Sequence, residues 1–431
     1  MASRFIVDQA KTHRRGGLKV ATERFTGSTL YGWLVSPYTA KVRAHLAYKG
    51  VPFQDSSPSA LQLFGRLQPA IGRLIMPTMK LSDGTWRQDS ALICDEIDAE
   101  HTEPSSRPSG ATQHLASMLL ELHADEWLPM LALHHRWDNP VNAAWAQSEF
   151  GRCAFPLLPR ALSGRLAKPM ADRMRAIRSA QYGRDPATHD GIQSHARLLV
   201  RTLEEHLAAG SPYLLGGRAC RGDFALYGPL WAHLYRDPFW RGALFGDAPH
   251  VVSWMERLHG HTADPAFPEL ASRPAAPPAA PDGRYLPSDA VPEALDPIFR
   301  AIFAEQWVHL IELWAALDAH LDEAARETVG GGVEEDVRAP RALGAVPFQV
   351  GGCAGERRLL TYSAWRTQRP LDLYATLQLA PSRELELASV NRWLTRIGAM
   401  EAFASLRPRW RIERDWRLPS SKEKFRATRV Q

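Results

Sequence analysis

The clearest pattern of apolar and polar positions lies near the N-terminus, where residues 30–35 form an apolar and aromatic run that ends at residues 36–39. Apolar residues with helical spacing follow this Ser-Pro-Tyr-Thr break, so the segment predicts a strand, a tight turn and a helix. Pro37 suits the first turn of a helix, where its missing N–H group is not needed. Ser36 is therefore expected at a helix N-terminus, where free N–H groups and the helix dipole stabilise an anion such as a thiolate.

Hydrophobic spacing also divides the first half of the chain into segments. Residues 28–101 alternate between strand and helix patterns, which is typical of a small α/β domain. Residues 101–110 are rich in proline and serine and predict a linker. From about residue 111 to 262 the spacing is helical, so this segment is expected to form an all-α domain.

The second half of the chain and the two ends have a different character. Residues 263–297 are rich in proline and alanine and predict a linker or an extended strap over the surface. Residues 298–418 are expected to form a mostly helical C-terminal extension, with short extended pieces and turns between residues 346 and 365. Residues 1–27 are interpreted as a flexible basic leader and residues 419–431 as a basic tail.

Composition and charge narrow the classes of function. The 431 residues are 45% hydrophobic and 23% charged, as in ordinary globular proteins. No apolar run approaches the roughly 20 residues of a membrane-spanning helix, so no membrane partner is expected. The net charge of +5 is concentrated at the two ends of the chain, and solvated ends are the favoured interpretation, which argues against a nucleic-acid partner.

Cysteine usage points to a reducing compartment. The four cysteines lie far apart and have neither metal-ligand spacing nor the pattern of a disulfide framework. The N-terminus carries no secretory apolar core. We therefore predict a cytoplasmic location.

Three sequence blocks resemble a known family. Residues 36–39 resemble the Cys-Pro-Tyr-Cys motif of thioredoxin-like redox proteins with both sulfurs replaced by hydroxyls. With residues 76–79 and 83–93, in one order and at suitable spacing, they are similar to the N-terminal domain of glutathione S-transferases. The run at 213–225 resembles the second domain of that family, in which Asp223 closes a capping box. The resemblance implies a thioredoxin-like α/β domain and an all-α domain, in a large bacterial-type member with an extra C-terminal region.

The resemblance implies that Ser36 is the catalytic residue. Its hydroxyl would donate a hydrogen bond to the thiol of glutathione and, with the helix dipole, lower the pKa of that thiol toward neutrality. A purely structural role for Ser36 as a helix cap is the alternative. Tyr31 is a rival for the catalytic role, although its place in the predicted strand favours packing. Thr39 lies one turn further along and is a candidate to assist.

The remaining groups of glutathione also have candidate partners. The Met76–Pro77 bond is expected to be cis, so that the backbone N–H and C=O of Met76 pair with the backbone of the ligand; an ordinary trans proline is the alternative. Ser90 and its helix N-terminus are expected to hold the γ-glutamyl carboxylate, and Asp89 to face the ammonium group. Arg73 is the candidate for the glycine carboxylate, in a segment longer than the family pattern.

A second substrate, a hydrophobic electrophile, is expected between the two domains, near Trp127 and residues 134–137. The adjacent His134 and His135, with Asp138, invite a metal interpretation. Neighbouring side chains on a helix point about 100° apart, however, and rarely share one metal ion. We therefore predict glutathione as co-substrate and no metal.

The predicted function is that of a glutathione S-transferase, in which the bound thiolate attacks a small electrophile, as in detoxification. Since members of this family are often dimers, the resemblance implies a homodimer. The alternative is a non-catalytic protein that binds glutathione or another ligand, or acts as a scaffold, on the same fold. The enzymatic prediction requires that the protein's own side chains do not fill the corner beside Ser36.

Overall fold

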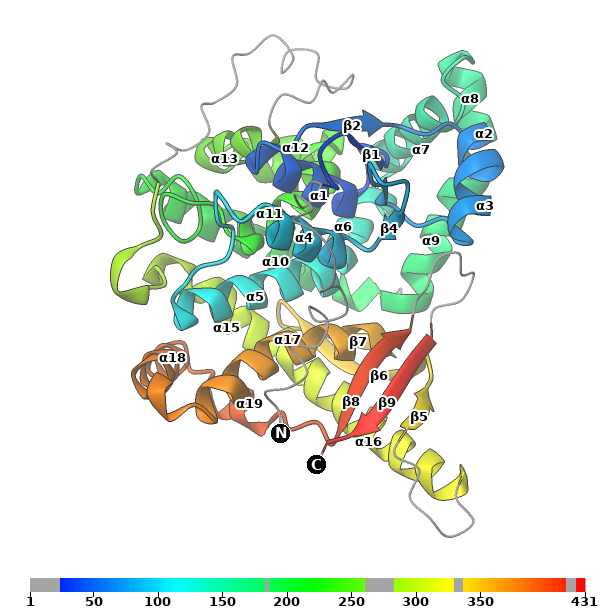
Figure 1. The fold of residues 1–431 in the computed structure, drawn as a ribbon. Coiled ribbons are helices and arrows are strands. Elements are labelled where there is room, and N and C mark those ends of the chain that lie inside the picture. Colours follow the sequence, from blue (N-terminus) through cyan, green and yellow to red (C-terminus); the bar gives the residue numbers. More distant parts are fainter. Residues whose placement is uncertain (1–23, 183–185, 260–282, 329–335, 416–423, 431) are drawn as a thin grey trace, which may run out of the picture.

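The computed structural model describes residues 24–182, 186–259, 283–328, 336–415 and 424–430 (Figure 1). The elements follow the chain in three groups, of which the first is an α/β domain. It contains β1 (Ser28–Tyr31), α1 (Pro37–Tyr48), β2 (Phe53–Ser56), α2 (Ala60–Gln62), η3 (Leu63–Leu67), α3 (Gln68–Ile71), β3 (Thr78–Lys80), β4 (Trp86–Gln88) and α4 (Ser90–Glu100).

This α/β domain is built on a sheet with the strand order β2-β1-β3-β4. Strands β1 and β2 are parallel, and the other two pairs are antiparallel. Helices α1 and α4 pack together beside the sheet, because apolar side chains of helices and strands share one core that includes Leu30, Val42, Met79 and Ile97. The predicted thioredoxin-like domain is confirmed.

The strand register gathers the segments that carry the candidate site. Tyr31 of β1 lies opposite Thr78 of β3, and Thr78 lies opposite Gln88 of β4. Strand β1 therefore ends, β3 begins and β4 ends at one edge of the sheet. The turn after β1, the turn before β3 and the start of α4 meet at this edge, which we call the site edge.

The second group is the predicted all-α domain. It contains α5 (Ala111–Glu126), α6 (Leu128–Trp137), α7 (Pro140–Ala154), α8 (Arg160–Leu166), α9 (Lys168–Tyr182), η4 (Pro186–Thr188), α10 (His189–Ala208), α11 (Arg221–Pro229), η5 (Leu230–Tyr235), α12 (Pro238–Phe245) and α13 (Pro249–His259). Helix α11 is buried along its whole length. The Asp223 carboxylate accepts hydrogen bonds from the backbone of Cys220 and Leu214 and from the indole of Trp254, at 2.9, 3.1 and 2.9 Å. Asp223 therefore has the predicted structural role.

The described part of the proline- and alanine-rich segment, from residue 283, contacts both the linker and the all-α domain, and we call it the strap. It includes η6 (Pro287–Asp289) and η7 (Glu293–Leu295). The Tyr285 hydroxyl donates to the carbonyls of Ser105 and Ala219 at 3.0 and 3.1 Å. The Asp289 carboxylate accepts from the backbone N–H groups of residues 112 and 113, so the strap caps the N-terminus of α5. Residues 263–282 of the predicted linker lie outside the described residues.

The third group is the C-terminal extension. It contains α15 (Asp296–Ala301), η8 (Ile302–Gln306), α16 (Trp307–Thr328), β5 (Asp336–Ala339), β6 (Ala342–Val350), β7 (Cys353–Leu360), α17 (Thr361–Gln378), η9 (Pro381–Arg383), α18 (Glu384–Arg396), α19 (Met400–Ser405), β8 (Trp410–Asp415) and β9 (Lys424–Arg429). Strands β6 and β7 form a hairpin whose turn, Gly351 and Gly352, has φ values of +53° and +84°. A Cβ atom on Gly351 would also lie 2.1 Å from the carbonyl oxygen of Gly191, so this turn requires glycine.

Described residues from both predicted basic ends of the chain take part in the fold, which the sequence did not predict. The segment expected to be a solvated basic tail contains β9, which lies between β5 and β8 and buries Phe425 and Ala427. At the other end, Phe25 of the predicted leader is fully buried in the core of the α/β domain. Basic and apolar residues alternate in β9, a pattern typical of a strand with one buried face, which the net charge of the segment does not show. Residues 1–23 of the leader lie outside the described residues.

The extension is an integral part of the fold. Helices α17 and α18 pack against α5, and Figure 1 shows the extension, coloured yellow to red, below that helix. One apolar cluster runs from Leu119 on α5 to Trp314 on α16 and Trp410 on β8. Among the helices of the described residues, none combines the length and the apolar character needed to cross a membrane.

Candidate functional site

Ser36 lies at the site edge as the N-cap of α1. Its Oγ accepts a hydrogen bond from the backbone N–H of Thr39 at 3.3 Å. Ser36 therefore caps the helix, which is the structural role predicted as the alternative to catalysis. Accepting this bond leaves the hydroxyl its own proton to donate. Ser36 is half-buried, and the positive end of the α1 dipole adds to the potential at its side chain. Tyr31, the rival candidate, packs against Trp86 with ring centroids 5.8 Å apart.

Thr39 does not fit its predicted role as an assisting residue. Its side chain is 0% exposed and lies behind Gly32. A Cβ atom on Gly32 would be 2.3 Å from the Oγ1 atom of Thr39, so the backbone of Gly32 closes this side chain off. The side chain of Thr39 is therefore not accessible to a ligand at the site edge. The one-turn spacing placed it correctly along the helix, but it could not show which side faces the protein.

The Met76–Pro77 bond is cis, as predicted. Met76 is half-buried at the site edge. Gln88 holds the segment before it, because its Nε2 donates to the carbonyl of Arg73 and to the hydroxyl of Thr78, both at 2.9 Å. The side chain of Arg73 is half-buried, and its contact with a ligand carboxylate stays a prediction.

Asp89 and Ser90 lie at the start of α4 and are each 7% exposed. Asp89 has a φ of +79°, a conformation that residues other than glycine rarely adopt. Its Oδ1 accepts from the backbone N–H groups of Ala91 and Leu92, at 2.9 and 3.2 Å. Asp89 is therefore the N-cap of α4, and one of its carboxylate oxygens is fully used by the helix.

The second carboxylate oxygen of Asp89 is bound by the extension, which the sequence did not predict. Oδ2 accepts from the Tyr362 hydroxyl of α17 at 2.7 Å and from the Arg414 guanidinium of β8 at 2.6 Å. Burial alone would raise the pKa of Asp89, but Arg414 and Arg366 hold it below its ordinary value. Tyr362 and Arg414 both lie in the C-terminal extension, for which the sequence predicts no partner in the first domain.

A layer of buried charges lies behind the site edge. The Lys41 ammonium of α1 contacts Glu121 and Asp125 of α5 at 2.7 and 2.6 Å. Arg366 of the extension contacts the same Asp125 at 2.9 Å. Burial would raise the pKa of Glu121, but Arg221 and Lys41 hold it well below its ordinary value. This layer connects all three parts of the chain through charged hydrogen bonds.

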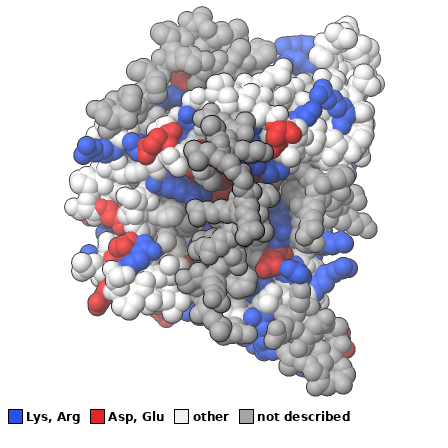
Figure 2. All heavy atoms as spheres, in the orientation of Figure 1, with Lys and Arg blue, Asp and Glu red and all other residues white. Residues whose placement is uncertain are grey.

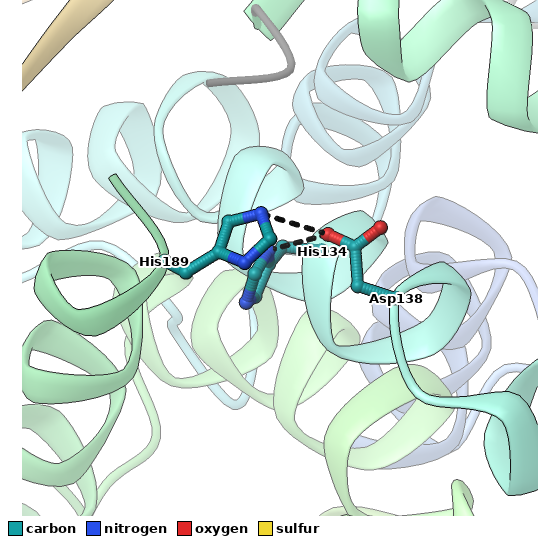
Figure 3. Close-up of side chains that lie close together, drawn as sticks. All are labelled: His134, Asp138 and His189. Atoms are coloured by element: carbon teal, nitrogen blue, oxygen red, sulfur yellow. Dashed lines mark ion pairs between the residues drawn. The ribbon is translucent and has the colours of Figure 1, made fainter. Parts of the chain in front are cut away.

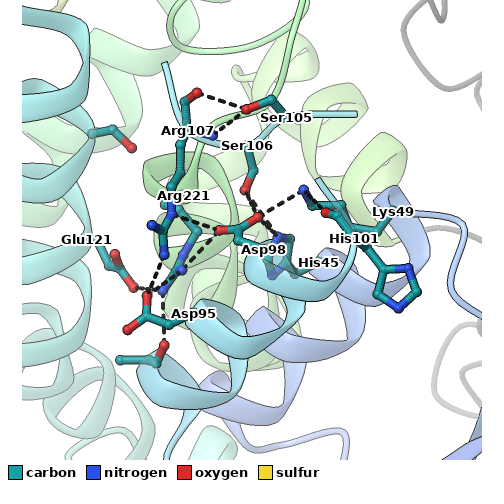
Figure 4. Close-up of polar contacts among 12 residues, drawn as sticks. His45, Lys49, Asp95, Asp98, His101, Ser105, Ser106, Arg107, Glu121 and Arg221 are labelled. Atoms are coloured by element: carbon teal, nitrogen blue, oxygen red, sulfur yellow. Dashed lines mark hydrogen bonds and ion pairs between the residues drawn. The ribbon is translucent and has the colours of Figure 1, made fainter. Parts of the chain in front are cut away.

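Arg221, at the first turn of α11, joins α4 to α5 in this layer (Figure 4). Its two terminal nitrogens contact Asp95 at 2.9 Å, Asp98 at 3.2 Å and Glu121 at 2.6 Å. Asp98 also contacts the ammonium of Lys49 at 2.9 Å. The guanidinium is buried with its carboxylates, so the loss of one partner leaves a buried charge without compensation. These contacts therefore stabilise the interface of α4, α5 and α11 only while every partner is present.

Residues expected to line a cleft for the second substrate are instead part of the core. Trp127 is 0% exposed, and His135 and Arg136 are each 1% exposed. Arg136 donates to the Asp237 carboxylate at 2.8 Å and to the carbonyl of Ala232 at 2.6 Å. The prediction that these residues contact an electrophile is therefore wrong, because helical spacing alone did not show that α6 is buried on this side.

Glu126, at the end of α5, is a buried carboxyl with an unusual pKa. Burial raises its pKa to about 7, although the Ser363 hydroxyl donates to it at 2.5 Å. Arg357 lies nearby, donating to the Glu126 carbonyl and stacking on Trp127 with its guanidinium 4.4 Å from the ring centroid. The carboxyl is therefore largely protonated below neutrality.

We expect the stability of the protein to fall as Glu126 ionises. The folded state keeps the proton that the unfolded state loses near pH 4.5, so the stabilisation is complete below pH 4.5 and is lost as the pH rises to about 7. Glu126→Gln should remove this dependence, and its free energy of unfolding relative to wild type should rise by about 2–3 kcal/mol between pH 5 and pH 8. Urea unfolding at both pH values measures this, with the exposed Glu413→Gln as control. An equal difference in unfolding free energy between Glu126→Gln and wild type at both pH values would contradict the prediction.

Neither the surface charges nor two cavities of the described residues point to the site edge, because residues elsewhere line both cavities. On the face shown in Figure 2, basic and acidic side chains lie interspersed, and the absence of a nucleic-acid partner stays a prediction. A cavity of about 660 Å³ is lined by residues of α10 and α12, among them His195 and Arg201. Another, of about 390 Å³, lies beside His134 and His189.

Comparison with known proteins identifies the first domain. Residues 30–105 match the family model described as glutathione S-transferase, N-terminal domain. No curated protein matches the chain.

Solved structures are similar to the chain at low identity. The beta-etherase LigF from Sphingobium sp. strain SYK-6 is 19% identical over 57% of this chain and 98% of its own, with a TM-score of 0.39. A glutathione S-transferase from Rhodospirillum rubrum F11 is 16% identical over 61% of this chain and 98% of its own, with a TM-score of 0.36. The glutathione transferase GSTFuA3 from Phanerochaete chrysosporium is 14% identical over 56% and 99%, with a TM-score of 0.39.

Proposed function

From the match of residues 30–105 to the glutathione S-transferase N-terminal domain, we propose that this protein binds glutathione at the site edge and that the glutathione thiolate attacks a small electrophile. The observation that carries the proposal is the position of Ser36. Its half-buried hydroxyl lies at the N-terminus of α1, with a proton to donate and the helix dipole behind it.

In this proposal Ser36 stabilises the thiolate, and the thiol proton leaves to solvent. The sulfur then forms a bond to an electrophilic carbon, and the leaving group departs with the electron pair of the bond that breaks. Met76 pairs with the ligand through its backbone, Ser90 and the N-terminus of α4 hold a carboxylate, and Arg73 faces the other carboxylate. Conjugation, dehalogenation and ether cleavage all fit this step. A cytoplasmic homodimer acting in detoxification is the accompanying proposal.

One observation favours a second candidate, a protein that binds a ligand without turnover. Asp89, proposed to face the ammonium of glutathione, already has four hydrogen-bond donors, and Arg414 and Tyr362 are two of them. A carboxylate has about four acceptor positions, so this end of the site is filled in the structure. Ser36, which would contact the thiol of glutathione, is half-buried.

Two measurements on the full chain test the proposal. Calorimetry with glutathione is expected to show binding, and an activity panel that covers aryl halides, alkyl halides and aryl ethers is expected to show turnover with at least one class. Binding without turnover on the whole panel would support the second candidate. If glutathione does not bind at all, the transferase proposal fails, and the second candidate would require a different ligand.

We expect Arg414 to compete with the ammonium of glutathione for Asp89. Arg414→Ala should therefore strengthen glutathione binding about tenfold, since a hydrogen bond to a charged group contributes about 1.5–3 kcal/mol. An analogue without the α-ammonium, glutaryl-cysteinyl-glycine, should gain no affinity. Calorimetry with both ligands measures the difference.

Arg411→Ala is the matched control for this variant. Arg411 lies on the same strand, β8, but its exposed side chain pairs with Asp372 at the surface. It should leave both affinities unchanged. If Arg414→Ala weakens both ligands equally, Arg414 supports the site and does not compete for it.

A further inference from the structure

A cluster of two histidines and one aspartate lies away from the site edge, on the surface between α6 and α10 (Figure 3). His134 Nδ1 is 2.7 Å from the carboxylate of Asp138, and His189 Nε2 is 3.6 Å from the same oxygen atom. One nitrogen or oxygen atom from each residue lies within 4.8 Å of the others. In the figure both imidazoles point toward the carboxylate.

The fold brings these residues together from two distant segments. His134 and Asp138 are four residues apart, so they lie on the same face at the end of α6. His189 is the first residue of α10, and its ring meets that of His134 at a centroid distance of 4.5 Å and an angle of 63°. The adjacent His134 and His135 point apart on one helix, but the fold supplies a second imidazole from another helix.

His135 takes no part in the cluster. Its Nδ1 donates to the carbonyl of Leu131 at 2.7 Å, and its ring is nearly perpendicular to that of His134, at 83°. Its side chain packs against Trp240. The rejection of the adjacent pair therefore agrees with the geometry, whereas His189 supplies the second imidazole.

We propose that His134, Asp138 and His189 bind a divalent transition-metal ion of the zinc type. Two imidazoles and one carboxylate are a donor set that suits zinc and cobalt(II). In tetrahedral zinc sites with bonds of about 2.0–2.1 Å, neighbouring ligand atoms lie roughly 3.3 Å apart. The observed separations of 2.7 and 3.6 Å lie on either side of that value.

Small side-chain movements would complete this site. The side chain of His189 is 38% exposed, whereas that of His134 is 6% exposed and pairs with Asp138. The cavity of about 390 Å³ beside the cluster gives the ion a position open to water, as in zinc sites with three protein ligands.

Arg197 lines the same cavity and opposes the binding of a cation. We therefore expect a dissociation constant in the micromolar range, weaker than that of a structural zinc site. The site is independent of the proposed glutathione chemistry, since its residues lie at the end of α6 and the start of α10 and not at the site edge. Failure of either proposal leaves the other in place.

Cobalt(II) titration of the full chain, freed of metal and of any histidine tag, tests the proposal. We expect visible absorption bands of four- or five-coordinate cobalt that saturate at one ion per chain and disappear when zinc is added. Asp138→Asn and His189→Asn should each weaken binding at least tenfold. Circular dichroism of each variant checks that it is folded, and the buried His134 is left unchanged for this reason.

His250→Asn is the matched control. His250 lies 2.6 Å from the Glu204 carboxylate, so it forms a similar exposed pair, but among the described residues it belongs to no group of three potential metal ligands. This variant should bind cobalt as the wild type does. The proposal is overturned if no saturable band forms, or if Asp138→Asn and His189→Asn bind cobalt as tightly as the control.

Discussion

Ser36→Ala is expected to lower kcat/KM for the glutathione-dependent reaction about 100-fold, the loss typical when a single donor to a developing or bound anion is removed. Glutathione affinity should change by less than about threefold, since most of the ligand contacts proposed at the site edge are made by other residues. The expected cause is a change in the bound thiol. Without the hydroxyl, its pKa should return toward about 8.5. The ultraviolet absorbance of the thiolate, followed against pH, measures this directly.

The matched control for this variant is Ser59→Ala. Ser59 is also a serine N-cap, of α2, where its Oγ accepts from the backbone of Gln62 at 3.4 Å. Both changes remove a cap, at a cost of about 1 kcal/mol of stability, but only Ser36 lies at the site edge. Equal activities of the two variants would show that Ser36 is a cap alone and would favour the non-catalytic candidate.

Arg221→Ala is expected to destabilise the protein by about 3–5 kcal/mol, because it leaves buried carboxylates without their main cation. Arg221 is 5% exposed and contacts Asp95, Asp98 and Glu121 at once. Since these carboxyls hold together α4, α5 and α11, the loss should affect the interface between the first two domains. Urea unfolding followed by tryptophan fluorescence measures the change.

Two comparisons separate this effect from the loss of an ordinary salt bridge. Arg411→Ala removes a bidentate pair with Asp372 that is exposed on both sides, and should cost no more than about 1 kcal/mol. The loss of unfolding free energy caused by Arg221→Ala should also become smaller as the pH falls from 8 to 5. Without the cation, the pKa values of the three carboxyls rise, so protonation relieves the buried charge. A loss of unfolding free energy that does not depend on pH would contradict this explanation.

The sequence by itself determined the features that depend on neighbouring residues. The break at residues 36–39 fixed the strand, the turn and the helix start, because proline and serine suit the first turn of a helix and its cap. Gly351 and Gly352 fixed a hairpin turn, and Asp223 fixed the start of a helix. These are local effects, which act over a few residues and leave a signature in the order of residue types.

Only the tertiary structure decided which side chains meet across the chain. Asp89 was expected to face a ligand, yet Tyr362 and Arg414 bind its carboxylate from more than 270 residues away. His189 joins His134 from another helix, and Thr39 is closed off by Gly32. The periodicity of hydrophobic residues and the order of charged residues describe one segment of the chain at a time. They carry no information about the packing of α17, β8 and β9 against the first two domains, and it is this packing that sets the burial and the charged partners of the candidate site.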